Sequence, residues 1–417
     1  MTPRQRSIVT VALISQGVSV GLTYGLLPVF LETLEAAFEA PRTVISSGQI
    51  LIMLSLTVGS IATGVFLDRG FGRAVMLAGA LLMAAAQALA AIAPNLWVLG
   101  LAAMMAGFSV PAIGPLAGAS LITRFFDQER GRALGLMAIG PPLGSGLFAA
   151  LAGQALVVAG WREAFAFFAL FPLVVLCPLI WRAVPARFDD PSPAGEDGRG
   201  AETAGDLDEA APPAAPVRGG GRSAGAASKS VLARPVFWWT AGVFALAAGV
   251  PTGWTVHVAA YLGGVGLSTA EQSTVLAAQF WMGVPGALVF GMLADRVSIT
   301  GLFVVMLSAV SLSMLGYAWL PSPLVVTLLA IVLGFATGGM IPLYMMLLGK
   351  RVGPEAMGRA MGLSNVFMLP VMAVAVLLAA SIFEAQGSYA SALIVFAIAV
   401  AAAIGCVFGS SWSARRS

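Results

Sequence analysis

Twelve apolar stretches separated by short polar loops constrain this chain more than any other feature of its sequence. A helix that crosses the hydrocarbon core of a bilayer needs about 20 mostly apolar residues. Only 10% of the residues are charged, against roughly a quarter in soluble domains. The sequence therefore predicts an all-α membrane protein with twelve transmembrane helices. We expect them at residues 7–31, 45–67, 74–94, 97–121, 131–157, 162–183, 236–262, 270–293, 300–319, 323–348, 358–382 and 387–409.

A repeated charged motif divides these helices into two sets of six. Gly64-x-x-x-Asp68-Arg69 returns 227 positions later as Gly291-x-x-x-Asp295-Arg296. The same ungapped step carries several other short motifs onto near copies of themselves, which indicates a duplicated half-unit. We therefore predict two pseudo-symmetric six-helix bundles, at residues 1–183 and 235–417. The other pairs are Gly107-Phe108 with Gly334-Phe335, Pro115-Leu116 with Pro342-Leu343, Arg124 with Arg351, and Gly131-Arg132-Ala133 with Gly358-Arg359-Ala360.

The segment between the bundles, residues 184–234, is rich in Pro, Gly, Ala, Asp and Glu. Such a composition cannot bury a hydrophobic core, so we expect a disordered cytoplasmic linker that acts as a tether or a regulatory segment. The net charge of +3 comes from arginines spread over the loops. These form no basic face with interleaved aromatic residues, which argues against a nucleic-acid partner.

The positions of Lys and Arg predict the orientation in the membrane, because cytoplasmic loops carry an excess of both. If both termini are cytoplasmic, Arg42 and Arg162 are the only two of the 22 basic residues that lie outside. The first apolar stretch is long and lacks a small-residue cleavage site, so we interpret it as a membrane helix. We expect a multi-pass protein of the cell (inner) membrane.

Several motifs resemble the major facilitator superfamily, and within it the branch of monocarboxylate-transporter-like and oxalate–formate-antiporter-like carriers. This resemblance implies a secondary active transporter that works by alternating access. Carriers of that branch usually have a basic residue in helix 8, where this chain has Gly286-Ala287. The motifs are Tyr24-Gly25-Leu26-Leu27-Pro28, Leu67-Asp68-Arg69, Gly72-Arg73, Arg124-Phe125-Phe126, Glu129-Arg130-Gly131-Arg132, Gly160-Trp161-Arg162, Val256-His257 with Tyr261-Leu262, and Gly291 to Arg296.

The duplicated motif has an electrostatic explanation. Asp68 and Asp295 lie at cytoplasmic helix ends, where a carboxylate can face helix N-termini and loop arginines. We expect such contacts to hold the outward-open state together and to break when the cytoplasmic side opens. Gly64 and Gly291 are expected to allow close helix approach beside them. The alternative is a set of solvated loop charges. The predicted gating residues are Asp68, Arg69, Arg73, Arg130, Arg132, Asp295, Arg296 and Arg359.

The predicted transport path is polar but uncharged. No Asp, Glu, Lys or Arg falls in the middle of an expected helix, where a charge costs about 2.5–3.5 kcal/mol. His257 shares a helical face with Trp254 and Tyr261, and we expect Pro251 to break or kink that helix. His257 either binds an anion or passes a proton in the cavity, or it is hydrogen-bonded at the outer interface. The predicted substrate-binding residues are Tyr24, Trp254, His257, Tyr261, Gln279, Trp281, Thr337 and Asn365.

Three functions remain open at this point. The first is transport of a small organic acid, monocarboxylate-like, with a coupled proton or a counter-transported anion. The second is export of apolar or aromatic compounds by proton antiport, favoured by the Gly140-Pro141-Pro142 run in helix 5. The third is a membrane sensor that does not transport. We find no nucleophile–base set and no metal-ligand cluster, so we expect no enzyme activity, no cofactor and no metal. Apart from substrate and lipid bilayer we expect no partner, and a monomer.

Overall fold

The computed structural model describes residues 2–126, 129–186, 232–294, 296–352 and 357–414. Asp295 and most of the predicted linker therefore lie outside the described residues. Within them the chain is helical throughout its two halves, and twelve helical runs are long and apolar enough to cross a membrane. This confirms the predicted fold class, an all-α membrane protein of two six-helix bundles.

The N-terminal bundle contains several membrane spans that are interrupted by short irregular turns. The first span changes to a π-helical turn, η1, and the fourth is interrupted at Gly114, between Pro111 and Pro115. Proline removes a helical hydrogen bond, which explains the second interruption. The elements are α1 (Pro3–Val20), η1 (Gly21–Gly25), α2 (Leu27–Phe38), α3 (Arg42–Ser46), α4 (Gly48–Asp68), α5 (Gly72–Ala91), α6 (Leu96–Ile113), α7 (Pro115–Phe125), α8 (Arg130–Met137), α9 (Gly140–Val158), α10 (Trp161–Phe171), η2 (Pro172–Leu176) and α11 (Cys177–Ala183).

The C-terminal bundle has longer uninterrupted helices. The helix that contains Pro251 runs through it without a break, so the expected break is absent. The fourth span of this bundle is interrupted once, at Gly339, between α16 and α17. The elements are α13 (Pro235–Gly264), α14 (Thr269–Ala294), α15 (Ile299–Trp319), α16 (Pro323–Gly338), α17 (Met340–Val352), α18 (Met357–Gln386) and α19 (Ala390–Ala414).

The sequence duplication recurs as a duplicated packing contact. A methyl group on Gly59 of α4 would collide with the carbonyl oxygen of Phe108 in α6. At the positions 227 residues later, a methyl group on Gly286 of α14 would collide with the carbonyl oxygen of Phe335 in α16. Only glycine lets the two helix backbones approach so closely. The two bundles are therefore built around the same helix–helix contact.

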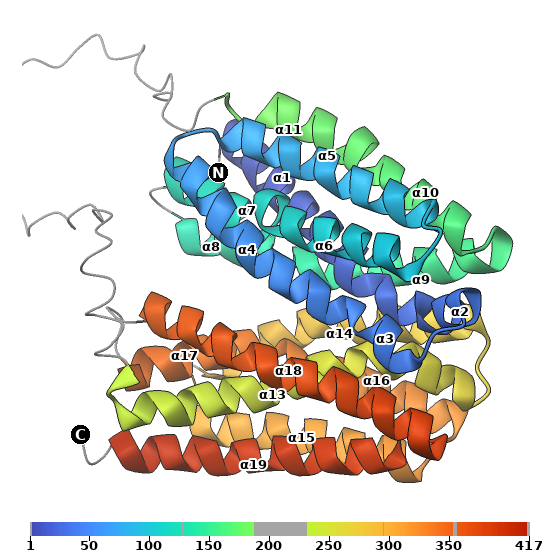
Figure 1. Ribbon diagram of the computed structural model, residues 1–417. Helices are drawn as coiled ribbons and strands as arrows, with labels where there is room; N and C mark the ends of the chain where they lie inside the picture. Colours follow the sequence, from blue (N-terminus) through green and yellow to red (C-terminus); the bar gives the residue numbers. More distant parts are fainter. Residues whose placement is uncertain (1, 127–128, 187–231, 295, 353–356, 415–417) are drawn as a thin grey trace, which may run out of the picture.

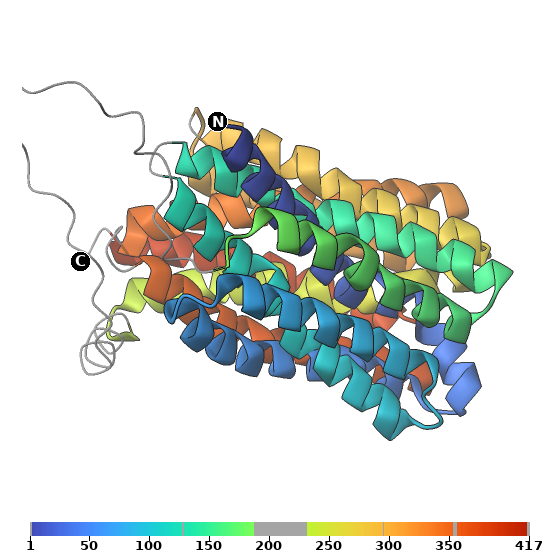
Figure 2. The same ribbon diagram turned by 90° about the horizontal axis from the view of Figure 1, so that it is seen from above.

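The two bundles lie side by side, with α1–α11 forming one and α13–α19 the other (Figure 1). The start of α1 and the end of α19 lie at the same end of the molecule in both views, and we call this end the terminal face (Figures 1 and 2). The turn between α2 and α3 lies at the other end, the opposite face. There α2 packs on α13 and α3 packs on α18, while α9 packs along α14. The bundles therefore meet at the opposite face.

The paired glycines allow a test of the duplicated contact. We expect Gly59→Ala and Gly286→Ala to destabilise the protein by about 1–3 kcal/mol each, because each methyl group must displace a backbone carbonyl. Gly64 and Gly291 are matched controls on the same two helices. A methyl group on Gly64 would meet nothing within 4 Å, and one on Gly291 would meet only the Pro342 Cβ at 3.9 Å.

Alanine favours a helix over glycine by about 1 kcal/mol, so both control variants should be neutral or stabilising. The measurement is the thermal unfolding midpoint in detergent. Equal midpoints for the Gly59 and Gly64 variants would contradict the packing argument.

Candidate functional site

The short turn between α2 and α3 places a charged side chain between the two bundles. Glu39 ends α2 in the left-handed backbone region at φ 47°, and Pro41 precedes the first residue of α3, which is Arg42. Only 7% of the Arg42 side chain is exposed. Its Nε lies 2.6 Å from Oε1 of Glu35 and its Nη2 lies 2.8 Å from Oε2. This two-point geometry is the strong form of a guanidinium–carboxylate pair.

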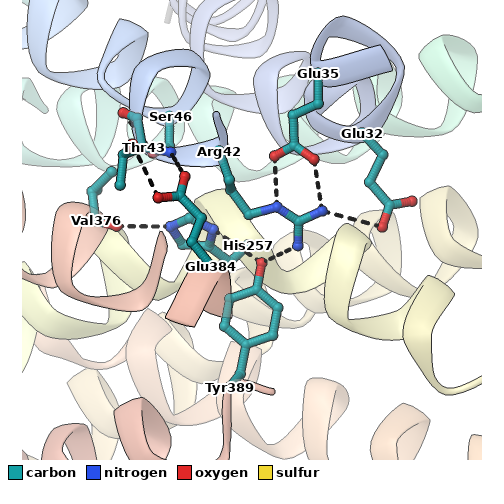
Figure 3. Close-up of polar contacts among 9 residues, drawn as sticks. All are labelled: Glu32, Glu35, Arg42, Thr43, Ser46, His257, Val376, Glu384 and Tyr389. Carbon is teal, nitrogen blue, oxygen red and sulfur yellow. Dashed lines mark hydrogen bonds and ion pairs between the residues drawn. The ribbon is translucent and has the colours of Figure 1, made fainter. Parts of the chain in front are cut away.

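The free side of the guanidinium reaches the other bundle (Figure 3). Arg42 Nη1 donates to the Tyr389 hydroxyl, with an N–O distance of 2.6 Å, and the guanidinium lies 4.0 Å from the Phe383 ring centre. Next to it, the backbone N–H of Thr43 donates to Glu384 at 2.7 Å. Polar contacts therefore join the bundles at the opposite face.

His257 extends this set of contacts into the C-terminal bundle. Its Nε2 lies 3.0 Å from the Val376 carbonyl oxygen and its Nδ1 lies 3.3 Å from the Tyr389 hydroxyl. A carbonyl oxygen only accepts, so Nε2 carries the proton and Nδ1 accepts from Tyr389. Burial raises the pKa of the Tyr389 phenol, which keeps this donor protonated. We call Glu35, Arg42, Tyr389 and His257 the Arg42 network.

Of the predicted substrate-binding residues, His257 belongs to this network, and Trp254 and Tyr261 lie beside it. Trp254 and His257 are fully buried in α13, and the Trp254 ring packs against the rings of Tyr261 and Tyr389. The Tyr261 hydroxyl donates to the carbonyl oxygen of Tyr317 at 2.5 Å. These side chains form an aromatic cluster inside the C-terminal bundle, in contact with Tyr389 of the Arg42 network.

The other predicted substrate-binding residues are spread over both bundles. In the N-terminal bundle the Tyr24 hydroxyl lies 3.2 Å from the Met53 sulfur. Trp281 is 43% exposed at the junction, where its Nε1 lies 3.3 Å from the Leu143 carbonyl oxygen of the other bundle. Gln279 is buried, and its Oε1 has no partner among the described residues.

The remaining two residues bond to their own helices. The Thr337 hydroxyl donates to the Leu333 carbonyl oxygen at 2.8 Å, and the exposed Asn365 amide donates to the Met361 carbonyl oxygen at 3.1 Å. In the described residues, neither side chain contacts the Arg42 network.

The predicted gating residues lie at the terminal face. Asp68, Arg69, Arg130, Arg296 and Arg359 are exposed there. In the described part of the chain, the hydrogen bonds and ion pairs of this set stay within one bundle. Asp295 lies outside the described residues.

Two of these arginines illustrate bonding within the N-terminal bundle. Arg73 Nε donates to the Val184 carbonyl oxygen at 2.6 Å, and Arg132 lies 3.2 Å from Glu129. A methyl group on Gly64 would meet nothing within 4 Å, so the prediction of a close helix approach at this glycine is wrong. The tight α4–α6 contact is instead at Gly59.

Glu35, Arg42 and Tyr389 were not among the residues predicted from the sequence to form a site. One signal was present, because Arg42 is one of only two basic residues placed outside by the charge pattern. The second, Arg162, donates to the carbonyl oxygens of Ala91 and Ala93 within its own bundle. Among the described residues, no three His, Cys, Asp or Glu side chains form a group that could hold a metal ion.

Comparison with known proteins gives a consistent result. A family model described as Major Facilitator Superfamily matches residues 12–376. No curated protein sequence matches the chain. Two solved structures of a bacterial homolog of the human lysosomal transporter Spinster, both inward-facing, share the fold.

The unoccupied form aligns with a TM-score of 0.76 at 13% identity, covering 100% of this chain and 98% of the other. The occupied form gives 0.75 at 12% identity, covering 99% and 98%. At this identity the similarity concerns the fold.

The two acidic residues near Arg42 should differ sharply in their effect on stability. Glu35 is the two-point partner of a buried guanidinium, so Glu35→Gln should cost about 3–5 kcal/mol. Glu32 is half exposed and its Oε1 lies 3.6 Å from Arg42, so Glu32→Gln should cost less than about 1 kcal/mol. The measurement is the thermal midpoint of each purified variant. Similar midpoints would show that Arg42 does not depend on Glu35.

Proposed function

The chain belongs to the Major Facilitator Superfamily, and from this premise we propose that it carries a small organic acid across the cytoplasmic membrane. The family and the fold support a transporter that works by alternating access. The observation that carries the substrate proposal is Arg42, a guanidinium held in carboxylate-binding geometry where the two bundles meet. A planar guanidinium fork is the side chain best suited to bind a carboxylate at two points.

The first step of the proposal concerns the conformational state. The bundles are joined at the opposite face by Arg42–Tyr389 and Thr43–Glu384, while the charged loops of the terminal face keep to their own bundles. The similar solved structures are inward-facing. We assign the same state to this structure, with the arginine-rich terminal face in the cytoplasm.

The second step concerns substrate capture. When the bundles separate at the opposite face, Arg42 must lose Tyr389 but keeps Glu35, because Glu35 belongs to its own bundle. The Nη1 that pointed at Tyr389 then faces the opening. An incoming carboxylate can take the place of the phenol and then compete with Glu35 for the guanidinium.

The third step concerns His257. In the closed arrangement its Nδ1 accepts from Tyr389, so this nitrogen has no room for a proton. Separation of Tyr389 from Arg42 frees the phenol to turn, and Nδ1 becomes able to take a proton from the outer solution. The charged groups at this part of the junction are Arg42, its partner Glu35, the more distant Glu32, and Glu384, which accepts from the Thr43 backbone. His257 is thus our candidate for coupling a proton to substrate entry.

At the terminal face, the predicted gating residues complete the cycle. Asp68 and the loop arginines would meet across the bundles when the cytoplasmic side closes, and they would separate in the state described here. The exposed positions of Asp68 and Arg69 support this proposal, because a released contact leaves its charges in water.

A second candidate function is export of aromatic or apolar compounds. It is favoured by Trp281, which offers an exposed ring at the junction between the bundles. The two functions differ in their need for Arg42, since a neutral aromatic compound has no carboxylate for it to bind.

Uptake into proteoliposomes tests the organic-acid proposal. We expect labelled monocarboxylates to accumulate, and Arg42→Lys to lower uptake about tenfold or more, because lysine cannot bind a carboxylate at two points. Arg162→Lys is the matched control at the same face and should stay within about twofold, since Arg162 bonds only within its bundle. Undiminished uptake in Arg42→Lys would contradict the role of Arg42. Flux of a neutral aromatic compound without monocarboxylate flux would favour export, and flux of neither would favour a sensor.

Asp68 allows a separate test of the cytoplasmic gate. Asp68→Asn removes a charge that we expect only the outward-open state to use, so the maximal uptake rate should fall about fivefold at unchanged thermal stability. The control is Glu39→Gln, an exposed acidic residue at the opposite face. A rate equal to that of the control variant would leave Asp68 as an ordinary solvated charge.

A further inference from the structure

The N-terminal bundle contains a cavity of about 520 Å³ that is separate from the bundle junction. It lies near the opposite face, between α4 and α6, and α2, α3 and α5 close its inner side. Its wall is almost wholly aliphatic or aromatic, with Leu26, Leu51, Ala90, Leu101 and Met104 as typical members.

The cavity lies where α4 and α6 stop being in backbone contact. At Gly59 and Gly107 the two backbones are in contact, with Gly107 against the Ile52 carbonyl oxygen. Closer to the opposite face, the lining residues Gly48 and Gly100 have no side chains to fill the space. A methyl group on Gly48 would meet nothing within 4 Å, and one on Gly100 would only just reach Leu51.

Water is a poor occupant for this cavity. The polar groups in the wall are already satisfied, since Gln87 donates to the Leu22 carbonyl oxygen at 3.2 Å and Thr23 donates to the Ser19 carbonyl oxygen at 2.9 Å. A cavity of about 520 Å³ has room for many water molecules, and each of them needs two to four polar partners. The chemistry of the wall therefore calls for an apolar occupant.

The surroundings of the opening identify that occupant. The cavity opens between the membrane spans Arg42–Asp68 and Leu96–Phe125. Its rim residues Leu101 and Met104 are about half exposed, so the opening is continuous with the surface that faces lipid. Trp97, at the outer end of the rim, is 90% exposed, and indole rings of this kind lie at the level of lipid headgroups.

We propose that this cavity is a binding site for one acyl chain of a phospholipid from the adjoining leaflet. The chain enters between α4 and α6 below Trp97 and lies against Leu26 and Ala90. The site also has a connection to the junction, because Leu34 and Val44 line it, while the neighbouring Glu35 holds Arg42, which reaches the other bundle. A bound chain therefore supports the turn that holds the Arg42 network.

Photolabelling tests the proposal on the full chain in lipid nanodiscs. The probe is a phosphatidylcholine with a diazirine in one acyl chain, and the labelled residues are located by peptide mass spectrometry. We expect labels on Leu51, Leu101 and Met104 at least about fivefold more often than on Leu312 and Ile398, which are exposed on the C-terminal bundle. Equal labelling at both sets would overturn the proposal.

Filling the cavity provides the matched control. Ala103→Phe puts a ring into the cavity and should reduce labelling of its wall to the level of Leu312, whereas Ala402→Phe on the lipid-facing side of α19 should change nothing. If Ala103→Phe is not monodisperse, Gly100→Leu fills the same space. Wall labelling that persists in a folded, filled variant would show that the label comes from lipid outside the cavity, and it would overturn the assignment.

Discussion

The guanidinium of Arg42 is the charge on which the junction of the two bundles depends. A buried cation costs several kcal/mol unless it is paired and hydrogen-bonded. Glu35 supplies the pairing and Tyr389 takes one of the remaining N–H groups. This requirement explains why α2 continues past Glu35 and then turns sharply at Glu39, because only such a turn brings Arg42 back onto the carboxylate.

The interior of each bundle is, by contrast, made rigid by backbone contacts. Gly59 against Phe108 and Gly286 against Phe335 are the same contact in the two halves, and neither leaves space for a methyl group. A structure built in this way changes most easily between its bundles rather than within them. The duplicated sequence thus specifies two bundles that are each held together by the same backbone contact. The contacts that differ between the two halves lie at the junction.

The sequence predicted the fold well because length, polarity and duplication are properties of the chain itself. The positions of the spans followed from apolar runs, and the halves from the 227-residue step. Arg42 and Tyr389 were missed as a pair because they are 347 positions apart, a separation that no local pattern reports. The first span also extends to Phe38 rather than 31, because Glu32 and Glu35 end the apolar run in the sequence but do not end the helix. Gly64 was misjudged for a related reason, namely that the neighbouring helix decides whether a glycine lies at a close contact.

The ion pair near the junction lies within one bundle, and only weaker contacts join the two bundles, so the bundles can separate and close again. The strong ion pair, Glu35 with Arg42, lies within one bundle, so it need not break when the bundles part. At the opposite face, the polar contacts of this turn that cross the junction are hydrogen bonds, from Arg42 to a phenol and from the Thr43 backbone to Glu384. Such bonds contribute about 1–3 kcal/mol each, whereas breaking a buried ion pair costs about 3–5 kcal/mol. If the ion pair itself joined the two bundles, the closed arrangement would be too stable for them to separate readily. With the pair confined to one side, opening this face breaks only such hydrogen bonds, a cost of a few kcal/mol that a bound substrate can offset.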